Sequence, residues 1–408
     1  MSSQVVEPEA VEPRTLWARA MDRARSGDLG SWPVIIALAL VVLVFSQTAQ
    51  NFFTPANFTN IITQMAGTCL LAYGVVFVLL IGEIDLSVSF VSGIGGVVVA
   101  QAQLPNGAHL PWYVCVFLAI LATTAIGAFQ GSVVALVGVP SFVVTLAGFE
   151  IWQGVILRWV PGVIVIQDPA INNFSNYLFP IGWWSGWVPG GWTLGVVVSL
   201  IYVAGVAGSA YAGVRHGIPI RQPALLVLKL VVVPLIALTT VGVLNRDRGV
   251  PLALLFVVGA LLVWTFVAKR TTFGRHVYAV GGNAEAARRA GINVPRIRIL
   301  VFMISGAMAG LGGIVLAARL NSVDLNAGGG TLLIDAIAAA VIGGTSLFGG
   351  RGEVRNALIG AAIISTVSNG MFILGYSTGT IFIVTGAILL LAVTFDTIAR
   401  RLQMRSGR

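Results

Sequence analysis

Apolar runs of about 20 residues recur along the whole chain, and they restrict its fold more than any other feature. A run of this length can cross the roughly 30 Å hydrocarbon core of a membrane as a helix. Because lipid offers no hydrogen bonds, a spanning segment must satisfy its own backbone. The runs are continuous and lack the alternation of a transmembrane barrel. We therefore predict an all-α polytopic membrane protein, and the low charged fraction of 10% agrees with this class.

We mark twelve such runs and predict about 12 spans, with a range of about 10 to 14. The third and tenth runs are short and rich in glycine, so we expect them to be broken or re-entrant. The second and ninth runs cross in opposite directions and each precedes one of the short runs, which favours inverted repeats. The twelve runs are 33–49, 60–81, 86–103, 112–137, 140–158, 192–212, 223–244, 250–268, 299–317, 331–348, 356–374 and 378–397.

The cations are distributed unequally between the two sides of this topology. Of the 24 Lys and Arg residues, 19 fall in segments on the side of the N-terminus and three on the opposite side. The positive-inside rule then places both termini in the cytoplasm and implies contact with anionic lipid rather than nucleic acid. We divide the chain into a cytoplasmic tail (1–31), a membrane domain (32–398) with a cytoplasmic loop at 269–298, and a basic cytoplasmic tail (399–408).

The longest outer loop, 159–191, carries no cation and contains the aromatic cluster IGWWSGW at 181–187. Tryptophan is enriched where a membrane meets water, so we interpret the cluster as an interfacial belt. Stacking against a carbohydrate is the alternative interpretation.

No motif for ATP hydrolysis or other catalysis is present in the sequence. The two lysines, Lys229 and Lys269, follow Leu228 and Ala268, so neither completes the GxxxxGK[ST] phosphate-binding loop. The three histidines and two cysteines are scattered, without the spacing of a metal site. We predict no catalytic residue, no metal site and no cofactor bound by this chain.

Polar side chains inside the predicted spans are candidates for a translocation path, or for bonds between neighbouring helices. Glu150 is the strongest candidate, because an ionisable group at that depth is costly and is usually functional or paired. Asp85 or Ser87 is expected to cap the helix that follows, with gating or proton coupling as the alternative for this segment. The other candidates for the path are Gln64, Gln130, Thr145 and Asn369.

The stretch GGNAEAARRAGINVPR, residues 281–296, predicts a short capped helix in the basic loop. Asn283 is a good N-cap, and Glu285 lies in the first turn, where the helix dipole favours an acid. The helix-forming residues Ala286, Ala287 and Arg288 follow, and Gly291 can take the left-handed conformation that ends a helix. The helix either fits a groove of a partner protein or rests on lipid headgroups.

Five stretches resemble the permease subunits of ABC importers for monosaccharides: LIGEIDLSV, VPSFVVTLAG, FGRHVYAVGGNAEAARRAGINV, DAIAAAVIGGTSLFGGRG and GAILLLAV. The resemblance extends from about residue 50 to 398. Two additional spans within 192–244, together with RGVP at 248–251, favour the xylose type over the shorter ribose type.

The resemblance implies an inverted-repeat permease of the inner membrane that imports a pentose such as D-xylose. It implies a homodimer of this chain, two copies of a separate cytoplasmic ATPase that uses ATP and magnesium, and an extracytoplasmic sugar-binding protein. It also implies that the ATPase couples through the capped helix, at Asn283, Glu285, Ala286, Ala287, Arg288 and Gly291. The alternative function is an ion-coupled secondary sugar transporter, in which Glu150 would be the coupling site.

Overall fold

A computed structural model describes residues 32–405 apart from 106, 175–176, 179–189, 218–219 and 221–222. The predicted N-terminal tail and the aromatic cluster at 181–187 lie outside the described residues. The helices are α2 (Trp32–Thr48), α3 (Pro55–Leu80), α4 (Val88–Ala102), α5 (Trp112–Ser132) with the π-helical turn η1 (Val133–Val137), α6 (Ser141–Trp159), α7 (Pro169–Asn172), α8 (Gly190–Arg215), α9 (Pro223–Leu244), α10 (Leu252–Arg270), α11 (Thr272–Gly282), α12 (Ala284–Arg289), α13 (Val294–Leu320), α14 (Leu332–Ile342), α15 (Val354–Ile373) and α16 (Thr378–Arg405).

The all-α class is confirmed. Within the described ranges, eight helices are long and apolar enough to cross a membrane: α3, α5 with η1, α6, α8, α9, α10, α13 and α15. Four shorter apolar helices, α2, α4, α14 and α16, occupy the positions of the other four predicted spans. The exact number of spans stays a prediction.

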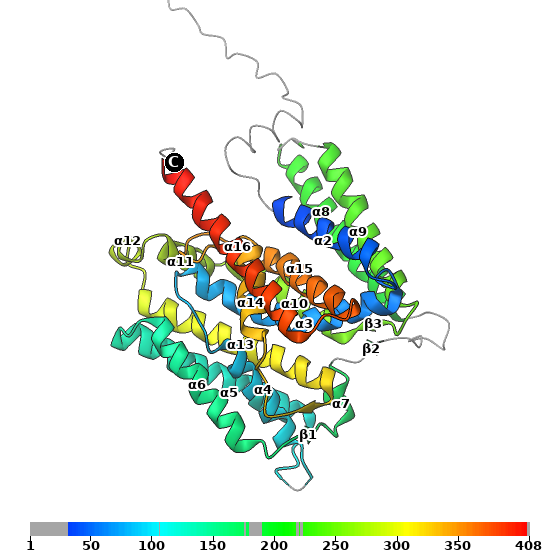
Figure 1. Cartoon of the computed structure of the whole chain (residues 1–408). Helices are drawn as coiled ribbons and strands as arrows, with labels where there is room; N and C mark the ends of the chain where they lie inside the picture. Colours follow the sequence, from blue (N-terminus) through cyan, green and yellow to red (C-terminus); the bar gives the residue numbers. More distant parts are fainter. Residues whose placement is uncertain are drawn as a thin grey trace, which may run out of the picture.

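The centre of the bundle is formed by α3 and α13, which run antiparallel (Figure 1). In the most apolar stretch of α3, 89% of the residues are buried, against 6% in α9. Small residues allow the close approach: a methyl group on Gly74 would lie 2.9 Å from the Cα atom of Ser305. In a membrane, where burial of apolar side chains gives little drive for association, such close packing holds helices together. Each of these long helices precedes a short one, α4 or α14, as the inverted-repeat prediction requires.

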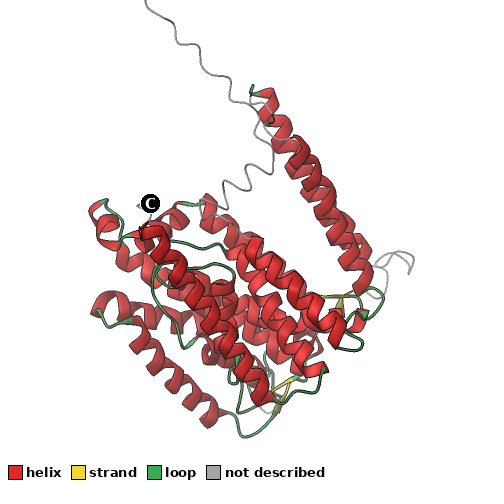
Figure 2. Ribbon diagram, turned by 45° about the horizontal axis from the view of Figure 1, so that its top comes forward, coloured by secondary structure: helices red, strands yellow, loops and turns green. Residues whose placement is uncertain are grey.

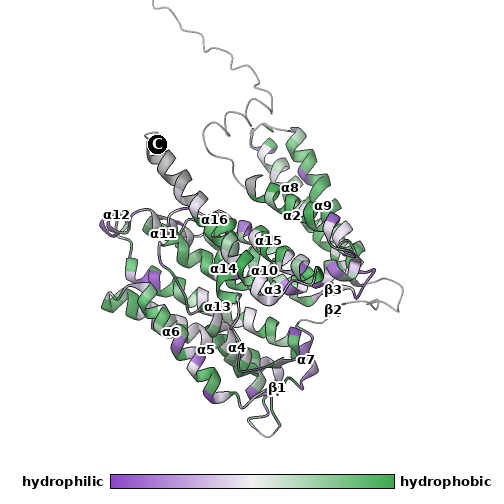
Figure 3. Cartoon of the chain, viewed as in Figure 1, coloured by the Kyte–Doolittle hydropathy of each residue, from purple (hydrophilic) through white to green (hydrophobic). Residues whose placement is uncertain are grey.

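The pair α8 and α9 stands at the edge of the bundle (Figures 1 and 2). Val241 and Leu244 of α9 anchor it against Ile62 of α3 and against Val250. Its remaining surface is largely hydrophobic (Figure 3), which suits contact with lipid. These are the two additional helices that the sequence placed within 192–244.

Loops that are far apart in sequence meet at the two ends of the bundle. At one end, β1 (Ile164–Val165) pairs with β4 (Ser322–Val323), and β2 (Tyr177–Leu178) pairs with β3 (Val250–Pro251), both antiparallel. At the opposite end, the backbone N–H of Gly350 donates to the carbonyl of Leu80, 2.9 Å away. The loops that meet at each end of the bundle are those that the predicted topology places on the same side of the membrane. We name the end that carries residues 269–298 the inner end.

The last helix is longer than the predicted span. The sequence placed its end at residue 397 and assigned 399–408 to a tail, but α16 continues to Arg405. Arg, Leu, Gln and Met are all good helix formers, so the polar extension remains helical beyond the apolar run.

Candidate functional site

The predicted capped helix is α12, which lies at the margin of the inner end (Figure 1). The Asn283 Oδ1 atom accepts the backbone N–H groups of Glu285 at 3.0 Å and Ala286 at 2.9 Å. Gly291 has φ +86°, the left-handed conformation expected at the helix stop. The predicted cap and stop are therefore both present in the structure.

One side of α12 is anchored and the other is open to solvent. Ala287 is buried, and its carbonyl accepts the N–H of Ile292 at 3.0 Å. Glu285 pairs with Arg288 at 3.7 Å and with Arg289 at 3.3 Å, and all three side chains are more than half exposed. Exposed pairs of this kind add little to stability. The short helix α12 is thus fixed by the buried Ala287 on one side and exposes charged side chains on the other.

A second helix, α11, precedes α12 and was missed in the sequence. Thr271 caps it by accepting the N–H of Gly274 at 3.2 Å, and Val277 and Val280 are buried on its inner side. The Thr271 cap and the valine spacing were the available signals. Asn283 ends α11 and begins α12, so the two helices are joined without a linker.

The joined helices contact the end of α3 directly. A methyl group on Gly281 would collide with the carbonyl oxygen of Leu80, so only glycine permits this approach. The Tyr278 hydroxyl donates to the carbonyl of Gly352 at 2.8 Å. The end of α11 is therefore wedged between the end of α3 and the loop 343–353.

Two ion pairs tie the same region together. Arg298, near the start of α13, pairs with Glu83 at 3.0 Å, and Lys269 pairs with Glu353 at 2.7 Å. Burial alone would raise the pKa of Glu353, but the hydrogen bond from Lys269 and the charges of Arg355 and Lys269 hold that pKa below its ordinary value. Glu353 is consequently ionised at neutral pH and holds the start of α15 against the end of α10.

Beyond α3 the chain turns back into the bundle instead of leaving it. Gly82, at φ +76°, makes the turn. Asp85 is buried, and its carboxylate accepts the Ser87 N–H at 3.0 Å, the Ser87 hydroxyl at 2.7 Å and the Ser305 hydroxyl at 2.8 Å. Since Ser305 packs beside Gly74, about 9 Å from the end of α3 at 1.5 Å per residue, α4 begins inside the bundle. Of the two predicted caps, Asp85 binds the start of α4 and the Ser87 side chain does not.

Two predicted path residues, Thr145 and Gln130, lie against polar groups of this re-entrant segment. The Thr145 hydroxyl lies 2.8 Å from the carbonyl of Ser141 on its own helix and 3.2 Å from the carbonyl of Ile84, while the Ser141 hydroxyl accepts the N–H of Ile84 at 3.2 Å. The Gln130 side-chain amide lies 2.9 Å from the Ser87 hydroxyl, whose single proton goes to Asp85. Non-helical backbone at membrane depth is tolerated only when protein supplies such partners. Gln130 and Thr145 are buried, so in this conformation they support the segment rather than face open space.

The remaining path candidates are not brought together with these two. Glu150 lies on the exposed face of α6, while Gln64 on α3 is half-buried. Asn369 on α15 is buried, and among the described residues its Oδ1 atom has no hydrogen-bond partner. Of the five predicted path residues, Glu150 alone is exposed on the surface of the single chain.

A second re-entrant segment approaches from the opposite end. Gly328, at φ +83°, packs so closely on the carbonyl of Ser89 that a methyl group would collide with it. The helix α14 begins just after this contact. Asp335 lies in its first turn, where its carboxylate accepts the Thr331 hydroxyl at 2.7 Å. Both short helices therefore start where the two re-entrant segments meet.

Comparison with known proteins places this architecture among transport proteins. Residues 57–393 match the family described as the branched-chain amino acid transport system permease component. The xylose transport system permease protein XylH of Escherichia coli K12 is 37% identical over 383 residues, 92% of this chain and 94% of that protein. XylH of Haemophilus influenzae is 36% identical over 388 residues, 92% and 98% of the two chains. The ribose import permease protein RbsC of E. coli K12 is 31% identical over 362 residues, 89% and 92% of the two chains.

Proposed function

Because the chain belongs to the branched-chain amino acid transport system permease family, we propose that it is the membrane-spanning permease subunit of an ATP-driven importer for a pentose such as D-xylose. The observation that carries the proposal is the 37% identity to a xylose permease over 92% of the chain. That match spans the central helices and both re-entrant segments. The sugar is delivered by a binding protein at the end opposite α12.

The energy comes from a separate cytoplasmic ATPase, which contacts α12. Support for this contact is the construction of α12: a short helix with a firm base and an exposed face. A partner can drive a conformational change only if it binds two states of the helix with different affinity. The residues we assign to the contact and its support are Asn283, Glu285, Ala286, Ala287, Arg288 and Gly291.

Motion of α12 would reach the membrane through two contacts on the loop after α3. Gly281 packs on Leu80, where that loop begins, and Arg298 pairs with Glu83 within the loop. The loop continues to Asp85 and the start of α4. A displacement of the joined α11 and α12 would therefore pull on the re-entrant segment, which is the gate in this proposal.

The transport unit is a homodimer whose path runs beside α6. A single chain leaves Glu150 on an exposed helix face with Leu146 and Leu157. A carboxylate facing lipid at that depth is costly, so this face should meet water or protein in the assembled permease. A second copy placed against α6 would enclose a polar path.

We propose an orientation in which both termini and α12 lie in the cytoplasm. The support is the excess of Lys and Arg at the inner end. Cysteines at His276 and Gln167, both exposed and at opposite ends, should react with an impermeant thiol reagent only from the inside and only from the outside, respectively.

Reconstitution tests the transport function. Vesicles that contain this permease, its ATPase and its binding protein should accumulate D-xylose when ATP is supplied to the ATPase side. Uptake should persist when ion gradients are collapsed and stop when the ATPase is left out. Uptake that follows the ion gradient and ignores the ATPase would contradict the proposal and support an ion-coupled carrier.

A further inference from the structure

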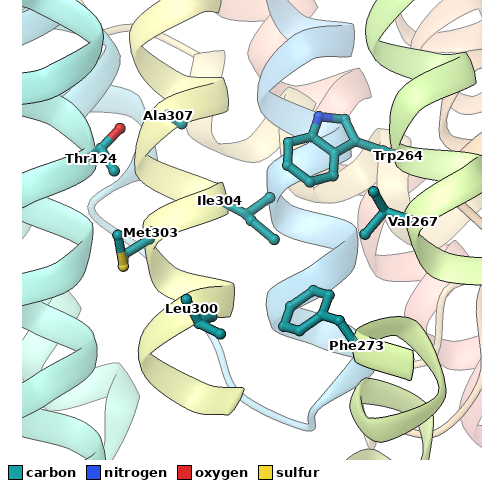
Figure 4. Close-up of a pocket in the computed structure, with 8 residues that line it drawn as sticks. All are labelled: Thr124, Trp264, Val267, Phe273, Leu300, Met303, Ile304 and Ala307. Carbon is teal, nitrogen blue, oxygen red and sulfur yellow. The ribbon is translucent and has the colours of Figure 1, made fainter. Parts of the chain in front are cut away.

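An apolar groove of about 350 Å³ runs along the side of the bundle between α5, α10, α11 and α13 (Figure 4). Its volume lies within the range of about 300 to 1,000 Å³ usual for ligand sites. Trp264 and Phe273 form one wall, and α13 forms the floor. The lining residues are Thr124, Trp264, Val267, Phe273, Leu300, Met303, Ile304 and Ala307.

The groove offers no polar atom to a ligand. The Thr124 hydroxyl donates to the carbonyl of Ile120 on its own helix at 2.6 Å. The Trp264 Nε1 atom donates to the Met308 sulfur at 2.9 Å, which leaves only the ring against the groove. A sugar or a nucleotide would lose its hydrogen bonds with water here and gain none. The lining is suited to hydrocarbon.

The groove is short enough to lie within one leaflet of a membrane. Its floor extends along α13 from Leu300 to Ala307, roughly 10 Å at 1.5 Å per residue. Ala307 is the central residue of α13 (Val294–Leu320), so the groove occupies the inner half of that helix. Half of a hydrocarbon core is about 15 Å. An acyl chain lying in the groove would therefore have its headgroup near the start of α13.

Cations stand at that end. Arg296 lies one helical turn before Leu300 on the same face of α13. Arg270 follows Val267 by about one turn at the end of α10. Both are exposed, and among the described residues neither of them forms an ion pair.

From this combination we propose that the groove is a binding site for an anionic phospholipid, with one acyl chain along α13 and the headgroup phosphate between Arg270 and Arg296. The lipid completes the wall between α10 and α13 on the membrane side. The site is independent of the proposed sugar transport, because the lipid binds the outside of the bundle.

Quenching of Trp264 fluorescence tests the site. The permease is reconstituted in phosphatidylcholine vesicles that contain equal mole fractions of either phosphatidylglycerol or phosphatidylcholine with brominated acyl chains. The signal of Trp264 is the difference between the natural chain and Trp264→Phe. We expect stronger quenching by the brominated phosphatidylglycerol. Arg296→Gln should weaken that preference about fivefold, the effect of one cation near an anionic headgroup.

Two further variants make the result specific. Ala307→Phe, which fills the groove, should remove the quenching of Trp264 by either lipid. Arg246→Gln removes a cation at the opposite end of the bundle and should leave the preference unchanged. Equal quenching by the two lipids in the natural chain would overturn the proposal. So would a Trp264 that no brominated lipid quenches, a result that indicates a second copy of the chain over the groove.

Discussion

Asp85 is the residue on which the re-entrant segment depends most. It joins the start of α4 to Ser305, which is 220 residues away in sequence. A buried carboxylate is costly unless hydrogen bonds satisfy it, and here three donors do so. If the carboxylate were removed, the Ser87 N–H and the Ser305 hydroxyl would lose this acceptor.

Asp85→Ala should therefore destabilise the permease strongly, since each buried donor left unsatisfied costs about 1–3 kcal/mol. Asp85→Asn keeps an acceptor for Ser87 and should lie between the alanine variant and the natural chain. Thermal unfolding in detergent measures both. Asp324→Ala is the control, because Asp324 accepts a similar backbone N–H in an exposed loop. If Asp85→Ala unfolds at the same temperature as this control, Asp85 does not hold the segment.

Glu353 predicts a dependence of stability on pH. A carboxylate whose folded-state pKa is lowered stabilises the fold at pH values above its unfolded pKa, about 4.5, and loses this effect as pH falls through the lowered folded value. The difference in unfolding temperature between the natural chain and Glu353→Gln should thus be constant near neutral pH and shrink below about pH 4.5. For comparison, Glu285→Gln on the exposed face of α12 should show a much smaller difference at every pH. A difference for Glu353→Gln that does not change with pH would contradict the assignment.

At the scale of elements, α12 can be broken without changing any helix that crosses the membrane. In Ala287→Pro the ring removes the hydrogen bond from the Ala287 N–H to the Asn283 carbonyl, 2.9 Å long, at a cost of about 3 kcal/mol. We expect a correctly inserted permease whose sugar uptake is lost and whose ATPase partner binds weakly. Co-purification of the ATPase and uptake should be measured together.

A second proline in the same helix provides the control. Ala284 is the first residue of α12, where proline is tolerated because its N–H has no partner within the helix. Ala284→Pro should retain most of the uptake. Normal uptake with proline at Ala287 would show that α12 does not transmit the motion, and would favour a helix that rests on lipid headgroups.

Some features of the helices could be predicted from the sequence and others could not. The difference is the sequence separation between a residue and its hydrogen-bond partner. The start and stop of α12 were predictable because Asn283 and Gly291 act within their own turn. The roles of Gln130 and Thr145 were not, because their partners Ser87 and Ile84 lie 43 and 61 residues away. Polarity alone suggested a translocation path for both residues.

The re-entrant segments show the same limit at larger scale. Short glycine-rich runs indicated broken spans, and α4 and α14 are indeed short. Which residues they meet depends on contacts such as Gly328 on Ser89 and Gly281 on Leu80, which join distant parts of the chain. A glycine in the sequence does not reveal which backbone will approach it.

For the whole molecule, the access of water to residue 150 distinguishes a dimer with a polar path from a chain surrounded by lipid. In the first case, the exposed face of α6 meets water in at least one state of the transport cycle. A cysteine in place of Glu150 should then react with a membrane-impermeant thiol reagent in the assembled permease. The natural cysteines, Cys69 and Cys115, are both buried and give little background.

The comparison position is Ile236, an exposed residue near the middle of α9 on the peripheral hairpin. Its cysteine variant should stay unreactive, because no partner is proposed for that hairpin and lipid excludes the reagent. Reaction at residue 150 should also change when ATP binds the partner ATPase, since a path that opens and closes alters its access to water. If residues 150 and 236 react equally slowly under all conditions, α6 faces lipid and the path must lie on another face of the bundle.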